Sequence, residues 1–257
     1  MIFLSEYKLN ETKRGYPFIP LIVNTPRFEF ISGVTVICGD NGSGKSTFAK
    51  ILATACNSFC VSYQKTQNSA FTDNAECFSV SRRFSPKRSF YFSAEDFIQF
   101  VRDVEERKLD ALQAIAEIDT DGKMSDHAKT LAKQPHVDTL VSFENFYGKS
   151  LAEVSHGQGF LTFFNKRLRE NGLYIIDEPE AALSSENQFL LATMIKDAAE
   201  NKNCQFVVCT HSPVIASVPN ADVYEIVEDS FVKTDWENVS DVSFLQMFFK
   251  YKDRLYK

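Results

Sequence analysis

The chain has 257 residues, of which 44% are apolar and 24% are charged, and its net charge is -6. This length fits one large α/β domain or two small ones. The acidic balance argues against a dedicated nucleic-acid binder but leaves room for a local basic patch. No apolar run approaches the roughly 18 residues that a membrane span needs, and Met1–Glu6 does not resemble a signal peptide. We therefore expect a cytoplasmic protein without membrane insertion.

The first part of the chain predicts a sheet that contains a phosphate loop. The apolar runs Phe18–Val23 and Phe28–Ile31 are interrupted by Pro and Asn, which is typical of edge strands and turns. Val34–Cys38 is continuously apolar and β-branched, the pattern of a strand buried on both faces of a parallel sheet. A glycine-rich loop follows, then a predicted helix over 45–58. Phe78–Ser93 is predicted to form two short strands around Pro86.

Helical spacing of apolar residues begins at Asp96 and continues to about Ala132, with a turn expected at Asp119–Lys123. Buried strands are predicted at 173–176 and 204–209, joined by a helix over 187–201, which implies a right-handed crossover in a parallel sheet. A last strand at 224–227 and an amphipathic helix from Asp241 complete the chain. Six cysteines without a CxxC pair do not suggest a zinc site.

Phenylalanine is over-used, with 24 residues. The simplest interpretation is a core filled with Phe. Two groups would instead suit a partner surface, namely Phe160, Phe163, Phe164 and Phe244, Phe248, Phe249.

Gly39–Ser46 has the pattern GxxxxGKS between a buried strand and a helix. Glycines let successive backbone N–H groups turn toward phosphate oxygens, and the helix N-terminus favours the same anion. Lys45 is placed to meet the β- and γ-phosphates, and the Ser46 hydroxyl to bind Mg²⁺. The sequence therefore predicts a site for ATP and Mg²⁺.

Two carboxylates end the second buried strand, in Leu173–Pro179. Ligands of open α/β sheets bind at this end of the strands. Asp177 is predicted to bind Mg²⁺, directly or through water, and Glu178 to polarise the attacking water. By themselves, adjacent acids there would equally suit a solvated strand end.

Two further motifs are weaker alone. Ser155–Gly159 opens a Phe-rich helix, where N–H groups favour an anion, although a simple Ser cap would look the same. Thr210–Pro213 follows the last central strand and places His211 near a γ-phosphate, although a lone His there is more often a polar loop residue.

In this order the motifs resemble an ATP-binding-cassette (ABC) ATPase. The phosphate-loop residues that match the family are Asn41, Gly42, Ser43, Gly44, Lys45, Ser46 and Thr47. Ser155, Gly157 and Gln158 match its signature, with His156 in place of a Gly. Asp177–Pro179 matches the carboxylate motif, 181–184 the D-loop, and His211 the switch histidine.

The resemblance implies an α/β P-loop NTPase fold with a mainly parallel sheet and an N-terminal antiparallel edge. It implies one ATPase domain over 1–257, with a helical subdomain at about 96–158 inserted between 1–95 and 159–257. It also implies a head-to-tail homodimer, or a higher assembly, in which Ser155 and Gly157 contact the γ-phosphate held by Lys45 of the other copy.

Two departures separate the chain from transporter subunits. The Gln that precedes their helical subdomain is missing, with Glu95 the nearest match, and the D-loop ends on Ser184 instead of Asp. The motifs look more like soluble ABC ATPases of chromosome maintenance, repair and phage defence, although no heptad run predicts a long coiled coil. We expect an ATP-driven switch on a protein partner; the alternatives are a transporter subunit and a scaffold without turnover.

Two further features of the sequence are weaker. The resemblance implies an aromatic residue stacked on adenine, for which Tyr16 and Phe18 are the candidates, although both also suit a core. A basic cluster surrounds Pro86 and would suit a solvated hairpin, a nucleic-acid contact or a surface for an acidic partner. Its members are Arg82, Arg83, Lys87 and Arg88.

Overall fold

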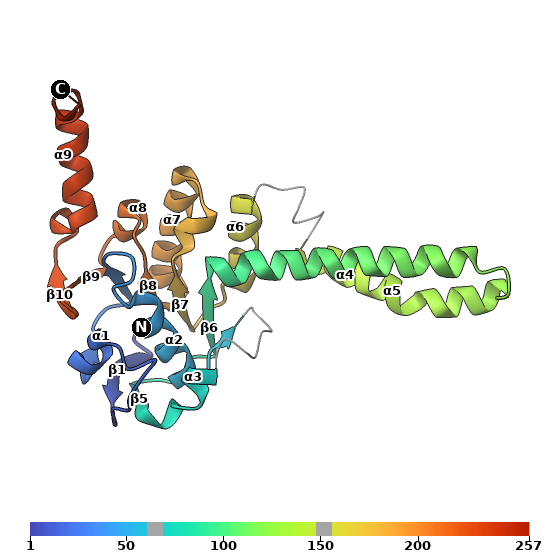
Figure 1. Ribbon diagram of the computed structural model, residues 1–257, viewed down its shortest axis with the longest axis horizontal. Helices are drawn as coiled ribbons and strands as arrows, with labels where there is room; N and C mark the ends of the chain where they lie inside the picture. The colour runs from blue at the N-terminus through green and yellow to red at the C-terminus, as the bar shows by residue number, and fades with distance from the viewer. Residues whose placement is uncertain (61–68, 148–155, 257) are drawn as a thin grey trace.

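The structure is a computed structural model that describes residues 1–60, 69–147 and 156–256, with backbone alone for 144–147 and 156–158. Within these residues a seven-stranded central sheet has the order β10-β9-β3-β8-β7-β6-β4 (Figure 1). Neighbouring strands are parallel except β9 and β10. The bounds are β3 Val34–Cys38, β4 Phe59–Cys60, β6 Arg88–Ser93, β7 Gly172–Asp177, β8 Gln205–Cys209, β9 Asp222–Val227 and β10 Ser230–Thr234.

The three central strands β3, β7 and β8 are buried at every residue. Burial on both faces explains why these strands are continuously apolar, because helices or a second sheet cover each face. Along β7 the faces alternate: Leu173 and Ile175 pack with one core cluster, Tyr174 and Ile176 with the other. The predicted mainly parallel sheet is confirmed.

A separate antiparallel sheet forms the expected N-terminal edge. Its order is β2-β1-β5, with β1 at Leu4–Leu9, β2 at Arg27–Glu29 and β5 at Phe78–Arg82. The strand expected within 18–23 is wrong, because Pro20 begins a short helix there, α1 at Pro20–Asn24. Proline fits the first turn of a helix, where no N–H donor is needed.

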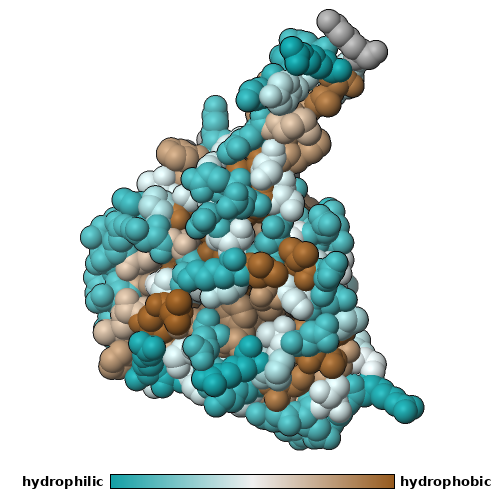
Figure 2. All heavy atoms as spheres, turned by 90° about the vertical axis from the view of Figure 1, so that its left-hand side faces the viewer, coloured by the Kyte–Doolittle hydropathy of each residue, from teal (hydrophilic) through white to brown (hydrophobic). Residues whose placement is uncertain are grey.

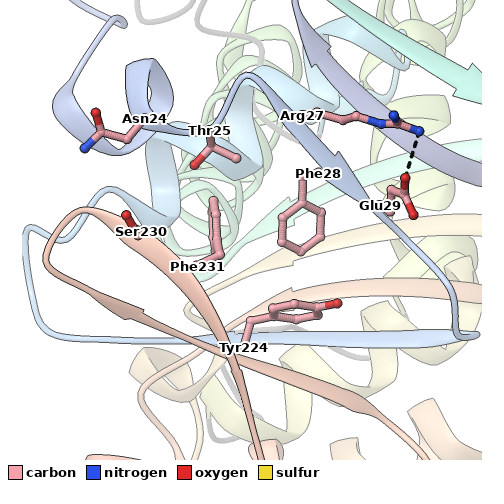
Figure 3. A pocket seen from close by; sticks show the side chains of 8 residues that line it. All are labelled: Asn24, Thr25, Arg27, Phe28, Glu29, Tyr224, Ser230 and Phe231. Carbon is pink, nitrogen blue, oxygen red and sulfur yellow. Dashed lines mark ion pairs between the residues drawn. The ribbon is translucent and has the colours of Figure 1, made fainter.

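The two sheets meet where β2 lies against β9 and β10. The Phe28 ring has its centroid 4.8 Å from that of Tyr224 and 4.9 Å from that of Phe231. These rings line a pocket of about 270 Å³, with Arg27 and Glu29 paired at its edge (Figure 3). None of the predicted site residues lines this pocket.

Helices cover both faces of the central sheet. On one face of the central sheet, the antiparallel sheet and α2 pack together, and α2 contributes Phe48 and Ile51 to the core. Helices α6 and α7 cover the opposite face of the central sheet. The remaining small elements are α3, α8 and three turns of 3₁₀-helix. The bounds are α2 Lys45–Ala55, α3 Ser69–Thr72, η1 Ala75–Cys77, α6 His156–Arg167, η2 Pro179–Ala182, α7 Ser185–Asn201, α8 Pro213–Ala216 and η3 Trp236–Asn238.

The phenylalanines of α6 belong to the core. Phe160, Phe163 and Phe164 are at most 2% exposed, and the Phe160 ring meets Phe92 edge to face at 4.6 Å. The partner-surface alternative is therefore wrong for this group. On α9 at Ser240–Leu255, by contrast, Phe244 is 56% and Phe249 70% exposed. This helix extends from the body, as Figures 1 and 2 show.

A two-helix arm projects from the opposite side of the body. It consists of α4 at Ala94–Thr120 and α5 at Asp126–Tyr147, which run antiparallel side by side (Figure 1). At 1.5 Å per residue, α4 is about 40 Å long. The chain reverses over 121–125, which agrees with the predicted turn.

Among the described residues, no helix has both the length and the apolar character that a bilayer crossing requires.

Candidate functional site

The phosphate loop joins β3 to α2 and depends on its glycines. Gly39 has φ 149° and Gly44 has φ 100°, in the region that side-chain-bearing residues avoid. A Cβ on Gly44 would also lie 2.5 Å from Cδ1 of Ile19. The backbone angle favours glycine at this position, and a side chain there would also displace Ile19.

The Lys45 side chain points back into the loop. It is 2% exposed, and its Nζ donates to the carbonyl oxygens of Gly39 at 2.8 Å and Asp40 at 3.0 Å. Nζ also lies 2.8 Å from Nε2 of His211. Since an ammonium can only donate, Nε2 accepts and the imidazole proton is on Nδ1.

Asp177 ends β7 with both carboxylate oxygens in hydrogen bonds. Ser46 Oγ donates to Oδ1 at 3.1 Å and Tyr91 OH donates to Oδ2 at 3.1 Å. Burial and the neighbouring Glu178 carboxylate raise the pKa of Asp177 to about 6, whereas the Ser46 and Tyr91 hydrogen bonds oppose the shift. A nearby cation would favour the ionised form.

The pair Ser46 and Asp177 fits Mg²⁺ when phosphates supply further ligands. Magnesium in nucleotide sites takes only one or two protein oxygens, and phosphate and water complete its octahedron. A hydroxyl and a carboxylate already 3.1 Å apart provide that minimum. No cluster of three or more His, Cys, Asp or Glu residues for a fully protein-bound metal exists in the described parts of the chain.

Glu178 has a left-handed backbone, with φ 46° and ψ 51°. For a residue with a side chain, this conformation costs on the order of 1–2 kcal/mol and is often found at functional sites. The Glu178 N–H donates to Cys209 O at 2.9 Å, which fixes β7 to β8 at this point. Its Oε1 lies 4.0 Å from Lys45 Nζ and 3.6 Å from His211 Nε2. The predicted cation, base and histidine therefore converge.

Two residues of the site were not predicted. Tyr91 lies on β6, whose register places Ser93 opposite Asp177. Glu180 accepts hydrogen bonds from the Thr210 hydroxyl at 2.8 Å and from the His211 N–H, so it holds the loop that carries the histidine. Its place three residues after Asp177 was the available signal, whereas nothing in the sequence linked Tyr91 to the site.

Of the two aromatic candidates for adenine, Tyr16 is better placed. Its hydroxyl is 3.5 Å from Oγ1 of Thr47, and its side chain is 52% exposed. Phe18 stacks on Phe78 at 5.5 Å and packs against the core. The Tyr16 ring also meets Phe71 edge to face at 5.3 Å, but it remains half exposed beside the phosphate loop, so Tyr16 is the better candidate of the two.

The remaining predicted residues lie outside the group formed by Lys45, Asp177, Glu178 and His211. Ser155 lies outside the described residues, and Gly157 and Gln158 belong to the first turn of α6. Glu95 lies in the first turn of α4. Ser184 caps α7 by accepting from the N–H of Asn187.

The basic cluster around Pro86 does not form a hairpin. Arg82 ends β5, which pairs with β1, whereas Arg88 begins β6, which pairs with β7. Arg82 donates to the carbonyl oxygen of Cys56 at 2.9 Å. The expectation of one solvated hairpin is wrong because these strands belong to different sheets.

Comparison with known proteins agrees with this geometry. The family model described as "ABC transporter" matches residues 28–181, more than half of the chain, and the model described as "AAA ATPase domain" matches 150–216. No curated protein matches.

Among solved structures, the ADP conformation of an ATP-binding cassette of an ABC transporter has 15% identity and a TM-score of 0.51, covering 97% of this chain and 99% of that one. The Smc head domain from Pyrococcus furiosus, with an extended coiled coil and bound to a domain of ScpA, has 13% identity and a TM-score of 0.49, covering 100% of both. The chain belongs to the ABC ATPase family and is an ATP-binding ATP hydrolase.

Proposed function

We propose that this ATPase binds ATP with Mg²⁺ between two copies arranged head to tail, and that hydrolysis acts as a switch on a protein partner. The observation that carries the proposal is the convergence of Lys45, Glu178 and His211 beside the Ser46–Asp177 pair. These groups come from three neighbouring parallel strands, β3, β7 and β8, and meet at the carboxyl ends.

The contacts of Lys45 suggest how ATP would enter. Phosphate oxygens would replace the carbonyl oxygens of Gly39 and Asp40 as partners of Nζ. Ser46 and Asp177 would hold Mg²⁺, which would neutralise charge on the β- and γ-phosphates when bound. The other proposed phosphate contacts are the backbone N–H groups of Asn41, Gly42, Ser43, Gly44 and Thr47. Tyr16 would stack on adenine.

Glu178 is the proposed general base. Its Oε1 lies 4.0 Å from Nζ of Lys45, and because Lys45 would meet the γ-phosphate, the Glu178 carboxylate would orient the attacking water. His211 would contact the γ-phosphate, which requires a proton on Nε2 and therefore the loss of its present role as acceptor from Lys45. The signature residues Ser155, Gly157 and Gln158 of the other copy would close the site.

The helical subdomain of about 96–158 is the proposed route to the partner. Ser93, which ends β6, caps α4 by accepting from the N–H of Asp96, and Tyr91 on the same strand contacts Asp177. A shift of Asp177 on nucleotide binding would therefore reach the base of a 27-residue helix through two residues. Partners in phage defence or DNA maintenance are the proposed targets.

The second candidate function is that of a transporter's ATP-binding subunit. The description of the matching family model favours it, whereas Glu95 in place of the usual Gln argues against it. Co-purification from the native host separates the two, because a multi-span membrane protein or a soluble effector would accompany the chain.

The test of the composite site uses Glu178→Gln, which keeps size but loses the carboxylate. We expect ATP to remain bound, hydrolysis to fall by roughly 10²-fold or more, and a dimer to accumulate with ATP and Mg²⁺ in light scattering. Glu186→Gln, an exposed change in the first turn of α7, is the control and should stay monomeric.

Adding Ser155→Arg to Glu178→Gln should abolish the dimer, since a long cation would occupy the partner's γ-phosphate position. The proposal fails if Glu178→Gln remains monomeric with saturating ATP, or if Ser155→Arg leaves the dimer intact.

A further inference from the structure

A basic pocket lies at the end of the central sheet opposite the nucleotide site. It has a volume of about 450 Å³ and is lined by Lys87, Arg88, Leu168, Arg169, Glu170 and Lys202. The strands β6 and β7 begin here, at Arg88 and Gly172, and end at Ser93 and Asp177 in the ATP site. Any ligand of this pocket is therefore separate from the nucleotide.

The backbone around the pocket is joined across three loops. The Lys87 N–H donates to Asn171 O at 2.9 Å, and the Asn171 N–H donates to Lys202 O at 2.9 Å. These bonds connect the loops before β6, β7 and β8. The Arg169 N–H donates to the hydroxyl of Tyr174 at 2.7 Å, which fixes the segment after α6 to a buried side chain. The cations therefore project from a preorganised frame.

The pocket lining carries an excess of positive charge. Four cationic side chains against one carboxylate leave an excess of three charges (4 − 1), in a chain whose net charge is -6. Among the described residues, Lys202 has an ion pair with Asp197, at a long 3.8 Å. No carboxylate of the described chain lies within 4.0 Å of the charged nitrogens of Lys87, Arg88 or Arg169.

We propose that this pocket binds phosphate groups, either of a nucleic-acid backbone or of free phosphate. Arg and Lys side chains that converge in one pocket are a usual way in which proteins hold phosphate oxygens, and three of the four cations here have no carboxylate within 4.0 Å among the described residues. The inference does not depend on the ATP site, because none of its residues lies there. Of the basic cluster around Pro86, only Lys87 and Arg88 line this pocket, so the proposed nucleic-acid contact lies here and not along the whole cluster.

The surface beside the pocket favours single-stranded nucleic acid as the source of the phosphate. The connection from β5 to Lys87 carries Arg83 and Phe84, both exposed, and Phe84 is 55% exposed. Single strands bind where a cationic groove follows the backbone and an aromatic ring stacks on a base. A free phosphate ion would use the pocket alone.

The experiment measures the fluorescence anisotropy of a labelled single-stranded DNA oligonucleotide with full-length protein at several salt concentrations. The test variant is Arg169→Glu with Lys202→Glu, and the matched control is Lys123→Glu with Lys252→Glu. The control changes the net charge equally, at the exposed tip of the arm and on α9. Neither variant touches the ATP site, so basal ATPase activity should be unchanged in both.

We expect the test variant to lose affinity by on the order of 10-fold or more, and its slope of log K against log[salt] to become shallower by about 1.4, for two lost contacts. The control should keep the wild-type slope. Phe84→Ala should weaken the binding of DNA but leave the binding of inorganic phosphate unchanged.

A second arm distinguishes free phosphate. Calorimetry with inorganic phosphate uses Lys45→Ala protein, to weaken phosphate binding at the phosphate loop, with and without the pocket substitutions. If the protein binds inorganic phosphate but not DNA, and the pocket substitutions abolish that binding, the pocket is a site for free phosphate. DNA and phosphate affinities that are both indifferent to Arg169→Glu with Lys202→Glu would overturn it.

Discussion

The Tyr91 hydroxyl donates to Oδ2 of Asp177 at 3.1 Å, from a neighbouring strand and 86 residues earlier in the chain. With Ser46 on the other oxygen, it leaves the carboxylate in a fixed orientation before any metal arrives. Burial raises the pKa of Tyr91 well above its ordinary value, so this hydroxyl stays a donor at neutral pH.

Tyr91→Phe is expected to weaken the binding of Mg²⁺ more than it weakens the binding of ATP. Loss of one hydrogen bond to a carboxylate costs about 1–2 kcal/mol, so the Mg²⁺ concentration for half-maximal activity should rise by roughly 5- to 30-fold. The measurement is ATPase rate against Mg²⁺, with ATP affinity measured separately in the presence of a chelator. An unchanged Mg²⁺ dependence would show that Tyr91 serves packing alone.

Asp177→Asn should stabilise the protein without nucleotide and metal while it reduces hydrolysis. The folded-state pKa of Asp177, about 6, lies above the ordinary 3.8, so the folded form is penalised as pH rises from about 4 to 6 and beyond. We expect a gain on the order of 1–3 kcal/mol at pH 7.5 in chemical denaturation with a chelator.

The gain of Asp177→Asn should shrink toward pH 4 and vanish near pH 3 and below, where the wild-type carboxyl is protonated in both the folded and the unfolded state. A gain that is the same at pH 4 and pH 7.5 would contradict the ionisation argument.

Lys45→Ala removes the ammonium that faces the proposed phosphate site. Charge-assisted hydrogen bonds contribute about 1.5–3 kcal/mol, so we expect ATP affinity in calorimetry to fall by roughly 10- to 150-fold. Lys123→Ala, at the exposed tip of the arm, is the control. Equal affinities of Lys45→Ala and wild type, with the fold intact by circular dichroism, would disprove the phosphate-loop assignment.

Tyr16→Ala should weaken ATP binding, whereas Tyr16→Phe should preserve it, because stacking depends on the ring and contributes roughly 1–3 kcal/mol. Phe18→Ala should instead lower the midpoint of thermal unfolding, since Phe18 packs on Phe78. Affinity for ATP and for a base-free triphosphate, compared for each variant, separates the two roles. Weakening of both ligands by Tyr16→Ala would contradict stacking.

Glu180→Gln should lower kcat with little change in ATP affinity. The side chain holds the N–H of His211 and the hydroxyl of Thr210, so it positions the histidine without reaching the nucleotide itself. Steady-state kinetics should show a fall in kcat of roughly 10-fold at nearly constant KM. His211→Ala combined with Glu180→Gln should be no slower than His211→Ala alone; additive losses would refute the positioning role.

The sequence alone determined the phosphate loop, the carboxylates after β7 and the parallel central sheet. Each is a local pattern: glycine spacing, a continuous apolar run, or polar residues directly after a strand. The helix over 185–201 and the reversal over 121–125 could be predicted from the sequence for the same reason.

Only the tertiary structure decided which distant residues meet. Tyr91 reaches Asp177 because β6 pairs with β7 in a register that no local pattern encodes. Arg88, Arg169 and Lys202 share one pocket because their loops precede neighbouring strands, although more than a hundred residues separate the first from the last. The order of strands is set by long-range packing, and that order decides the composition of both sites.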